Sequence, residues 1–190
     1  ILMASIIALR QDNLKRRLAY STVSQLSYVI LAALILSPLS TLGAALHVAV
    51  HAFGKITLFM AAGAIYTAAH KTKVSELDGI GKRMPWTMGA FAIGALSMIG
   101  LPPAAGFLSK WYMLLGALEV EQWFAVAVII GSTLLNAAYF LPIIYAAFLK
   151  PEITDSHAHV HGEAPLPIVL ALVTTGAGTI LLFLFPGPAL

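Results

Sequence analysis

Three ionisable side chains recur every four residues in an otherwise apolar stretch of the sequence: His47, His51 and Lys55. Residues four apart lie on one face of an α-helix, so the three would form a single stripe. Histidine titrates near neutral pH, and burial disfavours the charged form of lysine, so both groups can take up and release a proton. A lone buried histidine would more simply be a hydrogen-bonded structural residue, but three such groups together favour a proton relay.

Lys110 is a second candidate for the same chemistry. It lies in the middle of the apolar segment 104–118, as Lys55 lies near the middle of the segment 42–69. An ionisable group at the centre of a bilayer costs at least about 2.5–3.5 kcal/mol, so both lysines should face a protein interior or water. The alternative for Lys110 is that it caps backbone carbonyls freed by a break in the helix.

Several polar residues could support a chain of water molecules beside the lysines, although each is individually more typical of a hydrogen bond between helices. Lys15 lies at the membrane boundary, where it would be either an anchor or a point of access to the polar interior. The supporting candidates are Ser24 and Gln25 before the histidine stripe, Ser109 and Tyr112 beside Lys110, and Asn136 further along the chain.

The composition is that of a chain whose solvent is lipid. Of the 190 residues, 59% are hydrophobic and 10% charged, with a mean hydropathy of +0.90, whereas soluble domains are about 25% charged. The net charge of +3 is too small and too scattered to indicate nucleic-acid binding. The chain has no cysteine, phosphate-binding lysine loop or dinucleotide glycine motif, so no cofactor, metal site or catalytic residue is expected.

We therefore predict an all-α fold, a polytopic bundle forming a single membrane domain over residues 1–190. The apolar run 1–9 resembles the end of an earlier helix, and we expect the chain to be part of a longer protein. About 20 apolar residues span the hydrocarbon of a bilayer. The helices predicted on this basis cover residues 18–36, 42–69, 86–101, 104–118, 123–149 and 166–185.

Two segments leave alternatives open. The pair Pro102 and Pro103 must stop a helix, since proline lacks a backbone donor and clashes with the preceding turn. The flanking halves are then either two short helices joined by a tight turn or one helix broken near an ion path. The loop 150–163 carries His157, His159 and His161, which could bind a metal but are more typical of a solvated loop.

Three motifs resemble one family of membrane proteins. They are DNLKRRLAYSTVSQLSY at 12–28, HVAVHAFGK at 47–55 and GLPPAAGFLSK at 100–110. In this order they resemble signatures of the antiporter-like membrane subunits shared by Mrp-type cation/proton antiporters and by complex I, the NADH:quinone oxidoreductase. The stretches 110–118 and 135–142 look most like the D-type subunit of the Mrp antiporters.

The resemblance implies about fourteen helices in two inverted repeats, each with a broken helix, of which this chain would hold the second repeat and the final helix. It gives His47, His51 and Lys55 a central relay role and Lys110 a proton site on the broken helix. It places Lys15 at the start of the preceding helix. The partners implied are other membrane subunits of the same complex, the lipid bilayer, protons and Na⁺, in the inner cell membrane of a prokaryote.

Three functions remain open. The favoured one is a translocating subunit of a multi-subunit Na⁺/H⁺ antiporter. The alternatives are a proton-pumping, non-redox membrane subunit of complex I or a related hydrogenase, and a purely structural membrane subunit. The basic segments 10–17 and 70–85 should lie on one side of the membrane, which the positive-inside rule would make cytoplasmic.

Overall fold

The protein is described by a computed structural model over residues 1–151 and 162–187, so the histidine-rich positions His157, His159 and His161 lie outside the described residues. The predicted all-α class is confirmed, since every regular element within the described residues is helical. These elements are α1 (Leu2–Arg10), α2 (Leu14–Leu34), α3 (Pro38–Ala69), the short 3₁₀ turns η1 (Val74–Glu76) and η2 (Ile80–Lys82), α4 (Pro85–Ile99), α5 (Gly106–Glu119), α6 (Trp123–Leu149) and α7 (Leu166–Leu184).

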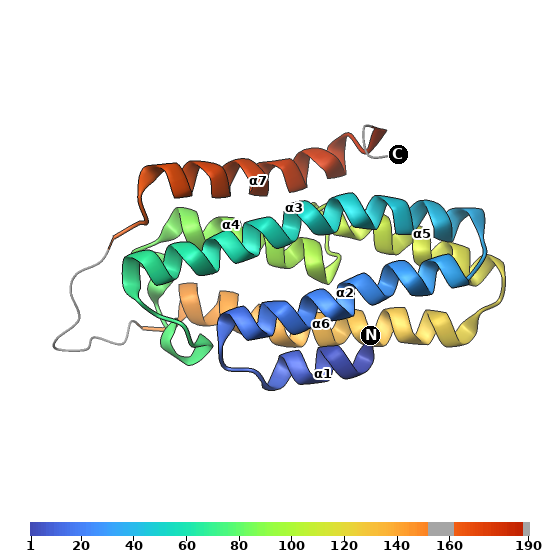
Figure 1. Ribbon diagram of the computed structural model, residues 1–190, viewed down its shortest axis with the longest axis horizontal. Helices are drawn as coiled ribbons and strands as arrows, with labels where there is room; N and C mark the ends of the chain where they lie inside the picture. Colours follow the sequence, from blue (N-terminus) through green and yellow to red (C-terminus); the bar gives the residue numbers. More distant parts are fainter. Residues whose placement is uncertain (152–161, 188–190) are drawn as a thin grey trace.

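The helices run roughly along the long axis of an elongated bundle, and α3 lies at its centre (Figure 1). Helix α3 packs against α2, α4, α5 and α7, while α1 and α6 pack against each other on the far side of α2. Among the described helices, α3, α6 and α7 are long and apolar enough to cross a membrane. Helix α2 is more polar because it carries polar side chains that face the interior of the bundle rather than lipid, namely Ser21, Ser24, Gln25 and Tyr28.

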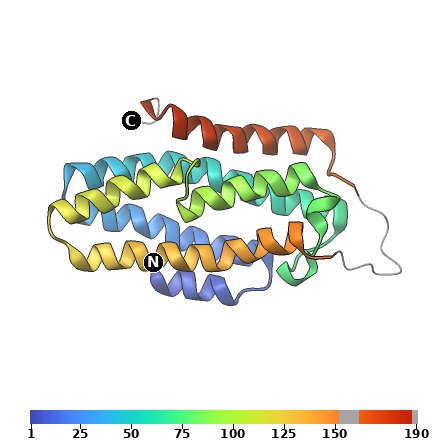
Figure 2. The ribbon, with the colours of Figure 1, turned by 180° about the vertical axis from the view of Figure 1, so that it is seen from behind.

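The break predicted at Pro102 and Pro103 is confirmed, because α4 ends at Ile99 and α5 begins at Gly106. Gly100 ends α4 with a φ of 90°, a left-handed conformation that glycine adopts without steric cost. Helices α4 and α5 follow one another along α3 instead of folding back as a hairpin (Figures 1 and 2). The two halves therefore form one discontinuous helix, with its break near the middle of the bundle.

Two helices begin earlier than the hydrophobic segments alone predicted. Helix α2 begins at Leu14 rather than near residue 18, because the Asn13 side chain accepts a hydrogen bond from the backbone N–H of Arg16 at 3.0 Å. Helix α3 begins at Pro38 rather than near residue 42, since proline is well suited to the first helical position. Lys15, Arg16 and Arg17 consequently belong to the first turn of α2.

Residues 70–84, which we call the hub loop, join several elements at one end of the bundle. The Leu14 N–H donates to the Thr72 carbonyl at 2.9 Å, and the Val74 N–H donates to the Asp12 carbonyl at 2.7 Å. The Asp12 carboxylate accepts from the Ser75 N–H at 3.0 Å and from its hydroxyl at 2.9 Å. The two basic segments of the sequence therefore lie together at the same end of the molecule.

The same end also holds the starts of α4 and α7 and the end of α6. The Gly79 N–H of the hub loop donates to the Ala146 carbonyl of α6 at 2.9 Å, and Lys150 forms a salt bridge with Asp78 at 3.2 Å. Glu163, just before α7, accepts from the Trp86 N–H at 2.7 Å and so caps the N-terminus of α4. These bonds link helices that are far apart in the sequence.

Candidate functional site

The interior of the bundle holds cations but no anions among the residues that the structure describes. Arg17, Lys55 and Lys110 are 9%, 6% and 5% exposed. Every acidic residue within the described ranges is at least partly exposed. Burying a charge without a partner of opposite sign is costly, so the contacts of each cation decide what it can do.

On α3, the predicted histidine stripe is buried. The rings of His47 and His51 stack with centroids 6.0 Å apart and an interplanar angle of 28°. The Nδ1 of His47 lies 2.8 Å from the hydroxyl of Ser109 on α5. The Nε2 atoms of both histidines are buried and have no hydrogen-bond partner within the described residues. Each ring therefore keeps one nitrogen available for a proton or a water molecule.

Lys55, about one helical turn beyond His51 on α3, binds α2. Its ammonium group donates to the Leu18 carbonyl at 3.1 Å and also to the hydroxyl of Ser21. It lies 5.9 Å from the centre of the Phe140 ring of α6, which adds a weak cation–π attraction. All of these partners are neutral, so Lys55 is not held in a permanent ion pair by the described residues.

Lys110 of α5 reaches back across the break in the discontinuous helix. Its ammonium group donates to the carbonyls of Met98 at 2.8 Å and Ile99 at 3.0 Å. These carbonyls belong to the last turn of α4, which lacks intrahelical donors and carries the negative end of the helix dipole. The geometry is therefore the carbonyl cap that the sequence left open as an alternative, and Tyr28 adds its ring 4.8 Å from the ammonium.

Two amide side chains, those of Gln25 and Asn136, lie beside the ammonium group of Lys110. Gln25 of α2 donates to the same Met98 carbonyl at 3.0 Å. When the Asn136 amide oxygen faces Lys110, it accepts from that ammonium at 3.1 Å and from Gln25 at 2.7 Å, while its nitrogen donates to the Tyr139 hydroxyl at 2.6 Å. This orientation provides partners for both ends of the Asn136 amide. Helices α2, α5 and α6 thus meet in one polar network at the end of α4.

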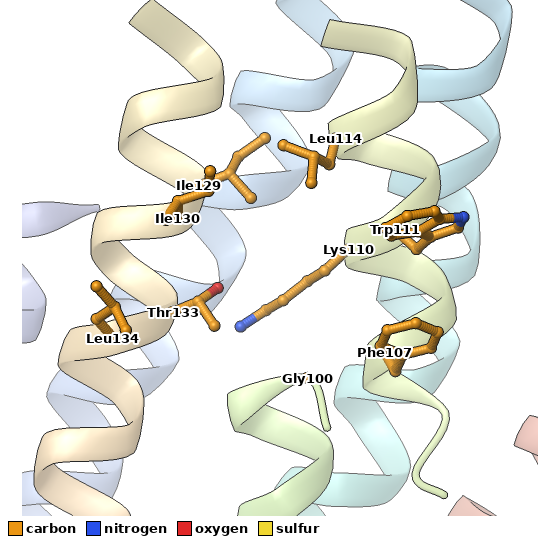
Figure 3. Close-up of a pocket in the computed structure, with 9 residues that line it drawn as sticks. All are labelled: Gly100, Phe107, Lys110, Trp111, Leu114, Ile129, Ile130, Thr133 and Leu134. Atoms are coloured by element: carbon orange, nitrogen blue, oxygen red, sulfur yellow. The ribbon is translucent and has the colours of Figure 1, made fainter. Parts of the chain in front are cut away.

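A cavity opens beside this network. It lies between α5 and α6, has a volume of about 180 Å³ and is lined mostly by apolar side chains. Figure 3 shows Lys110 extending from α5 toward α6 on the side of Thr133, past Gly100. A Cβ atom on Gly100 would lie 2.8 Å from the Lys110 Cδ, so the glycine leaves room for this path. The side chain of Lys110 therefore runs between the cavity and the interior.

Three of the residues singled out from the sequence lie elsewhere. Lys15 is exposed, and its ammonium lies 5.2 Å above the ring of Tyr66. Tyr112 is half-buried in an apolar cluster beside α7. Ser24 is buried, but its hydroxyl bonds to Ser5 of α1 at 2.7 Å. The structure does not bring these three side chains together with Lys55 or Lys110.

The sequence alone does not predict a role for Arg17, because it is one of several cations in the basic segment 10–17. The structure buries it on the inner face of α2. Arg17, Ser21, Ser24 and Tyr28 follow one another at spacings of four, three and four residues, which is the spacing of one helix face. This phase relation with the polar face of α2 is the signal that could have identified it.

The three polar motifs and the discontinuous helix agree with a known family. A family sequence model described as "NADH:quinone oxidoreductase/Mrp antiporter, TM" matches residues 1–136. The chain belongs to this family. The resemblance stated from the motifs is thereby confirmed, and so is the membrane character of the chain as an antiporter-like subunit of Mrp or complex I type.

Individual members of the NADH:quinone oxidoreductase/Mrp antiporter family match over much of the chain. The NADH-quinone oxidoreductase subunit N of Desulforudis audaxviator is 49% identical over 150 residues, which are 79% of this chain and 30% of that protein. The chain thus corresponds to less than a third of the length of this relative.

Solved structures support the fold at lower identity. A chain of the Mrp complex from Dietzia sp. DQ12-45-1b matches with a TM-score of 0.88 at 23% identity, covering 96% of this chain and 42% of that one. A chain of respiratory complex I from Thermus thermophilus matches with a TM-score of 0.83 at 24% identity, covering 97% and 38%. The fold is therefore a part of a larger antiporter-like subunit.

Proposed function

We propose that the parent protein is a proton-translocating membrane subunit in which Lys55 and Lys110 take up and release protons. The observation that supports this is that both lysines are buried against neutral acceptors. Lys55 donates to the Leu18 carbonyl and the Ser21 hydroxyl. Lys110 donates to the carbonyls of Met98 and Ile99. A buried ion pair would fix the charge of a lysine, because losing the proton would leave a carboxylate unpaired. Neutral acceptors carry no such penalty, so either protonation state is accessible.

The histidines would connect these lysines through water. The ring centroids of His47 and His51 are 6.0 Å apart, and successive members of the stripe rise about 6 Å along the helix. Such separations are too long for most direct hydrogen bonds, so bridging waters are required for proton transfer. The unpartnered Nε2 atoms of His47 and His51 are suitable contacts for those waters. Lys15, exposed at the surface, lies outside this route.

The first candidate for the parent complex is an NADH-quinone oxidoreductase or a related redox-driven complex. It is supported by the 49% identity to a protein named as subunit N of such an oxidoreductase. Redox chemistry would then occur on other subunits, which would be the partners of this one in a prokaryotic cell membrane. The sequence features that resemble the D-type Mrp subunit, with the fold likeness to an Mrp complex, support a second candidate, a Na⁺/H⁺ antiporter subunit.

The decisive experiment replaces Lys55 by alanine in the full-length protein, assembled in its complex. Inverted membrane vesicles are energised, and the formation of a pH gradient is followed with a fluorescent dye. We expect the Lys55→Ala complex to assemble normally, because the change removes a costly buried charge, and to lose all or nearly all coupled proton transport. The matched control is Lys82→Ala, which removes an exposed lysine of the hub loop and should transport like the wild type. Wild-type transport by Lys55→Ala would refute the relay and favour the structural alternative.

The driving reaction separates the two candidate complexes. If the parent is redox-driven, adding its electron donor should generate the pH gradient without any added Na⁺. If the parent is an antiporter, adding Na⁺ to respiring vesicles should dissipate an existing gradient, and the electron donor should have no direct effect on the purified complex. In both cases the Lys55→Ala variant should lose the response.

A further inference from the structure

Arg17 is the buried cation that the proposed proton route does not use. It lies on α2 four residues, or about 6 Å of helix rise, before Ser21, and so nearer to the hub loop than the binding site of Lys55. Its side chain is 9% exposed. A guanidinium keeps its charge at every pH that proteins experience, unlike a lysine. Arg17 therefore cannot pass a proton on, and its contribution must come from its charge or its bonds.

All hydrogen bonds of the Arg17 guanidinium within the described residues go to backbone carbonyls. Its Nε donates to Gln11 at 2.8 Å, its Nη1 to Tyr139 at 3.1 Å and its Nη2 to Leu9 at 3.5 Å. Carbonyl dipoles solvate the charge but do not cancel it. Asp12, the nearest acidic residue in the sequence, attracts Arg17 electrostatically but forms no salt bridge with it within the described residues, because its carboxylate is bound by Ser75 of the hub loop. A positive charge that no direct ion pair cancels is consequently fixed at this point.

The position of that charge is defined by three elements. Leu9 and Gln11 belong to the end of α1 and the turn that follows it, whereas Tyr139 belongs to α6, three residues before Pro142. The guanidinium thus lies where α1, α2 and α6 meet, between the hub-loop end and Lys55. A proton or metal cation moving along α2 toward Lys55 from that end would have to pass it against like-charge repulsion.

We propose that Arg17 is an electrostatic barrier that prevents protons and cations from leaking between the hub-loop end and Lys55. This inference rests on the proposed function, because a barrier has a role only where a polar route exists. A fixed positive charge in a narrow passage excludes cations in other membrane pores. Arg17 makes the route asymmetric, with a closed end near the hub loop and an accessible end elsewhere.

The alternative role for Arg17 is purely one of position. By binding the Tyr139 carbonyl it would hold α6, and with it the Asn136 side chain that Lys110 contacts. The two roles differ in what they require. A barrier needs only the charge, whereas positioning needs the three-way hydrogen bonding of the guanidinium, which a lysine cannot reproduce.

The test is the passive decay of an imposed pH gradient in liposomes that contain the parent complex without its driving substrate. Arg17→Gln should speed the decay by roughly tenfold, because the repulsion is removed. Arg17→Lys should decay like the wild type at acidic pH, where the introduced lysine keeps its proton, and faster at higher pH, where a lysine buried against neutral carbonyls can lose it. The control Arg16→Gln removes a charge from the neighbouring, exposed position and should also decay like the wild type. If Arg17→Lys at acidic pH leaks as fast as Arg17→Gln, the barrier is overturned in favour of positioning, and if Arg17→Gln leaks no faster than the wild type, the barrier is refuted.

A second variant keeps the test decisive if Arg17→Gln does not assemble. Gln11→Glu retains Arg17 but adds a carboxylate to the residue whose backbone carbonyl binds the guanidinium, which should weaken the barrier and increase the leak. In that case a wild-type leak in Gln11→Glu would refute the barrier, while loss of coupled transport in Lys55→Ala would still uphold the proposed function. Normal transport in Lys55→Ala would instead refute the proposed function itself.

Discussion

The ammonium of Lys110 lies 2.8 Å from the carbonyl oxygen of Met98, across the break between α5 and α4. One residue thus supplies both a candidate proton carrier and the bond that closes the broken helix. The contact with Ile99 at 3.0 Å gives the same ammonium a second carbonyl from the last turn of α4. A change at this position should therefore alter stability as well as transport.

Lys110→Met should destabilise the protein more than Lys55→Met. Removing the ammonium of Lys110 leaves the Ile99 carbonyl without this donor at an open helix end, and an unsatisfied buried acceptor costs about 1–3 kcal/mol. The Leu18 carbonyl that binds Lys55 also accepts from the Thr22 hydroxyl at 2.9 Å, so it keeps a partner. Thermal unfolding of the two purified variants in the same detergent measures the difference. Equal stability losses would contradict the capping role of Lys110.

Gly106→Ala should disrupt the packing of the broken helix. A Cβ atom at this position would collide with the backbone carbonyl of Ser97, and backbone cannot move aside as a flexible side chain can. We expect a loss of several kcal/mol or failure to assemble, detected as a lower yield of folded complex and a lower unfolding temperature. Gly63→Ala is the matched control, since nothing lies within 4 Å of its added Cβ. It should stabilise α3 by up to about 1 kcal/mol through helix propensity.

Much of this arrangement could be predicted from the sequence because it depends on local spacing. The four-residue repeat of His47, His51 and Lys55 defines one helix face whatever the surroundings, and two adjacent prolines stop a helix in any context. The burial of Arg17 could not be predicted from composition, because Lys15, Arg16 and Arg17 look alike as interfacial cations. Only Arg17 shares the helical spacing of the polar face of α2, and the packing of that face against α1 and α6 buries it.

The hydrogen-bond partners of the lysines could not be predicted from the sequence either. Met98 and Ile99 bind Lys110 through backbone carbonyls, and a carbonyl carries no signal in the residue type. For Ser24, in contrast, the sequence predicted a role beside the lysines that the structure does not show. Ser24 shares the polar face of α2 with Ser21, yet it bonds to Ser5, a residue of α1 whose position along α2 follows from tertiary packing alone.

Asp12→Asn should weaken the attachment of the hub loop in a pH-dependent way. The Ser75 N–H bonded to its carboxylate holds the pKa of Asp12 below its ordinary value. A lowered pKa in the folded state means that the contribution is present above the unfolded-state value, near 3.9, and is lost as the pH falls through the folded value. The unfolding temperature of Asp12→Asn should therefore lie slightly below that of the wild type at pH 7, and the gap should close below about pH 4.

Scanning calorimetry at a series of pH values measures this gap. Glu121→Gln is a suitable control, because its exposed side chain at the other end of the bundle takes part in none of the described hydrogen bonds or salt bridges. It should match the wild type throughout. A gap between wild type and Asp12→Asn that persists unchanged to pH 3 would mean that the carboxylate charge is not what binds Ser75.

The hub loop has a consequence for how the bundle can move. It fastens the α1–α2 turn and the end of α6 at one end of the molecule, and the Glu163 cap joins the starts of α4 and α7 there. At the opposite end, the described turns share one side-chain bond, from Ser37 to Glu119 at 2.9 Å. Local opening is easiest where few hydrogen bonds join neighbouring elements. We therefore expect the backbone amides of the turns around Ser37 and Glu119 to exchange their hydrogens sooner than those of the hub-loop end.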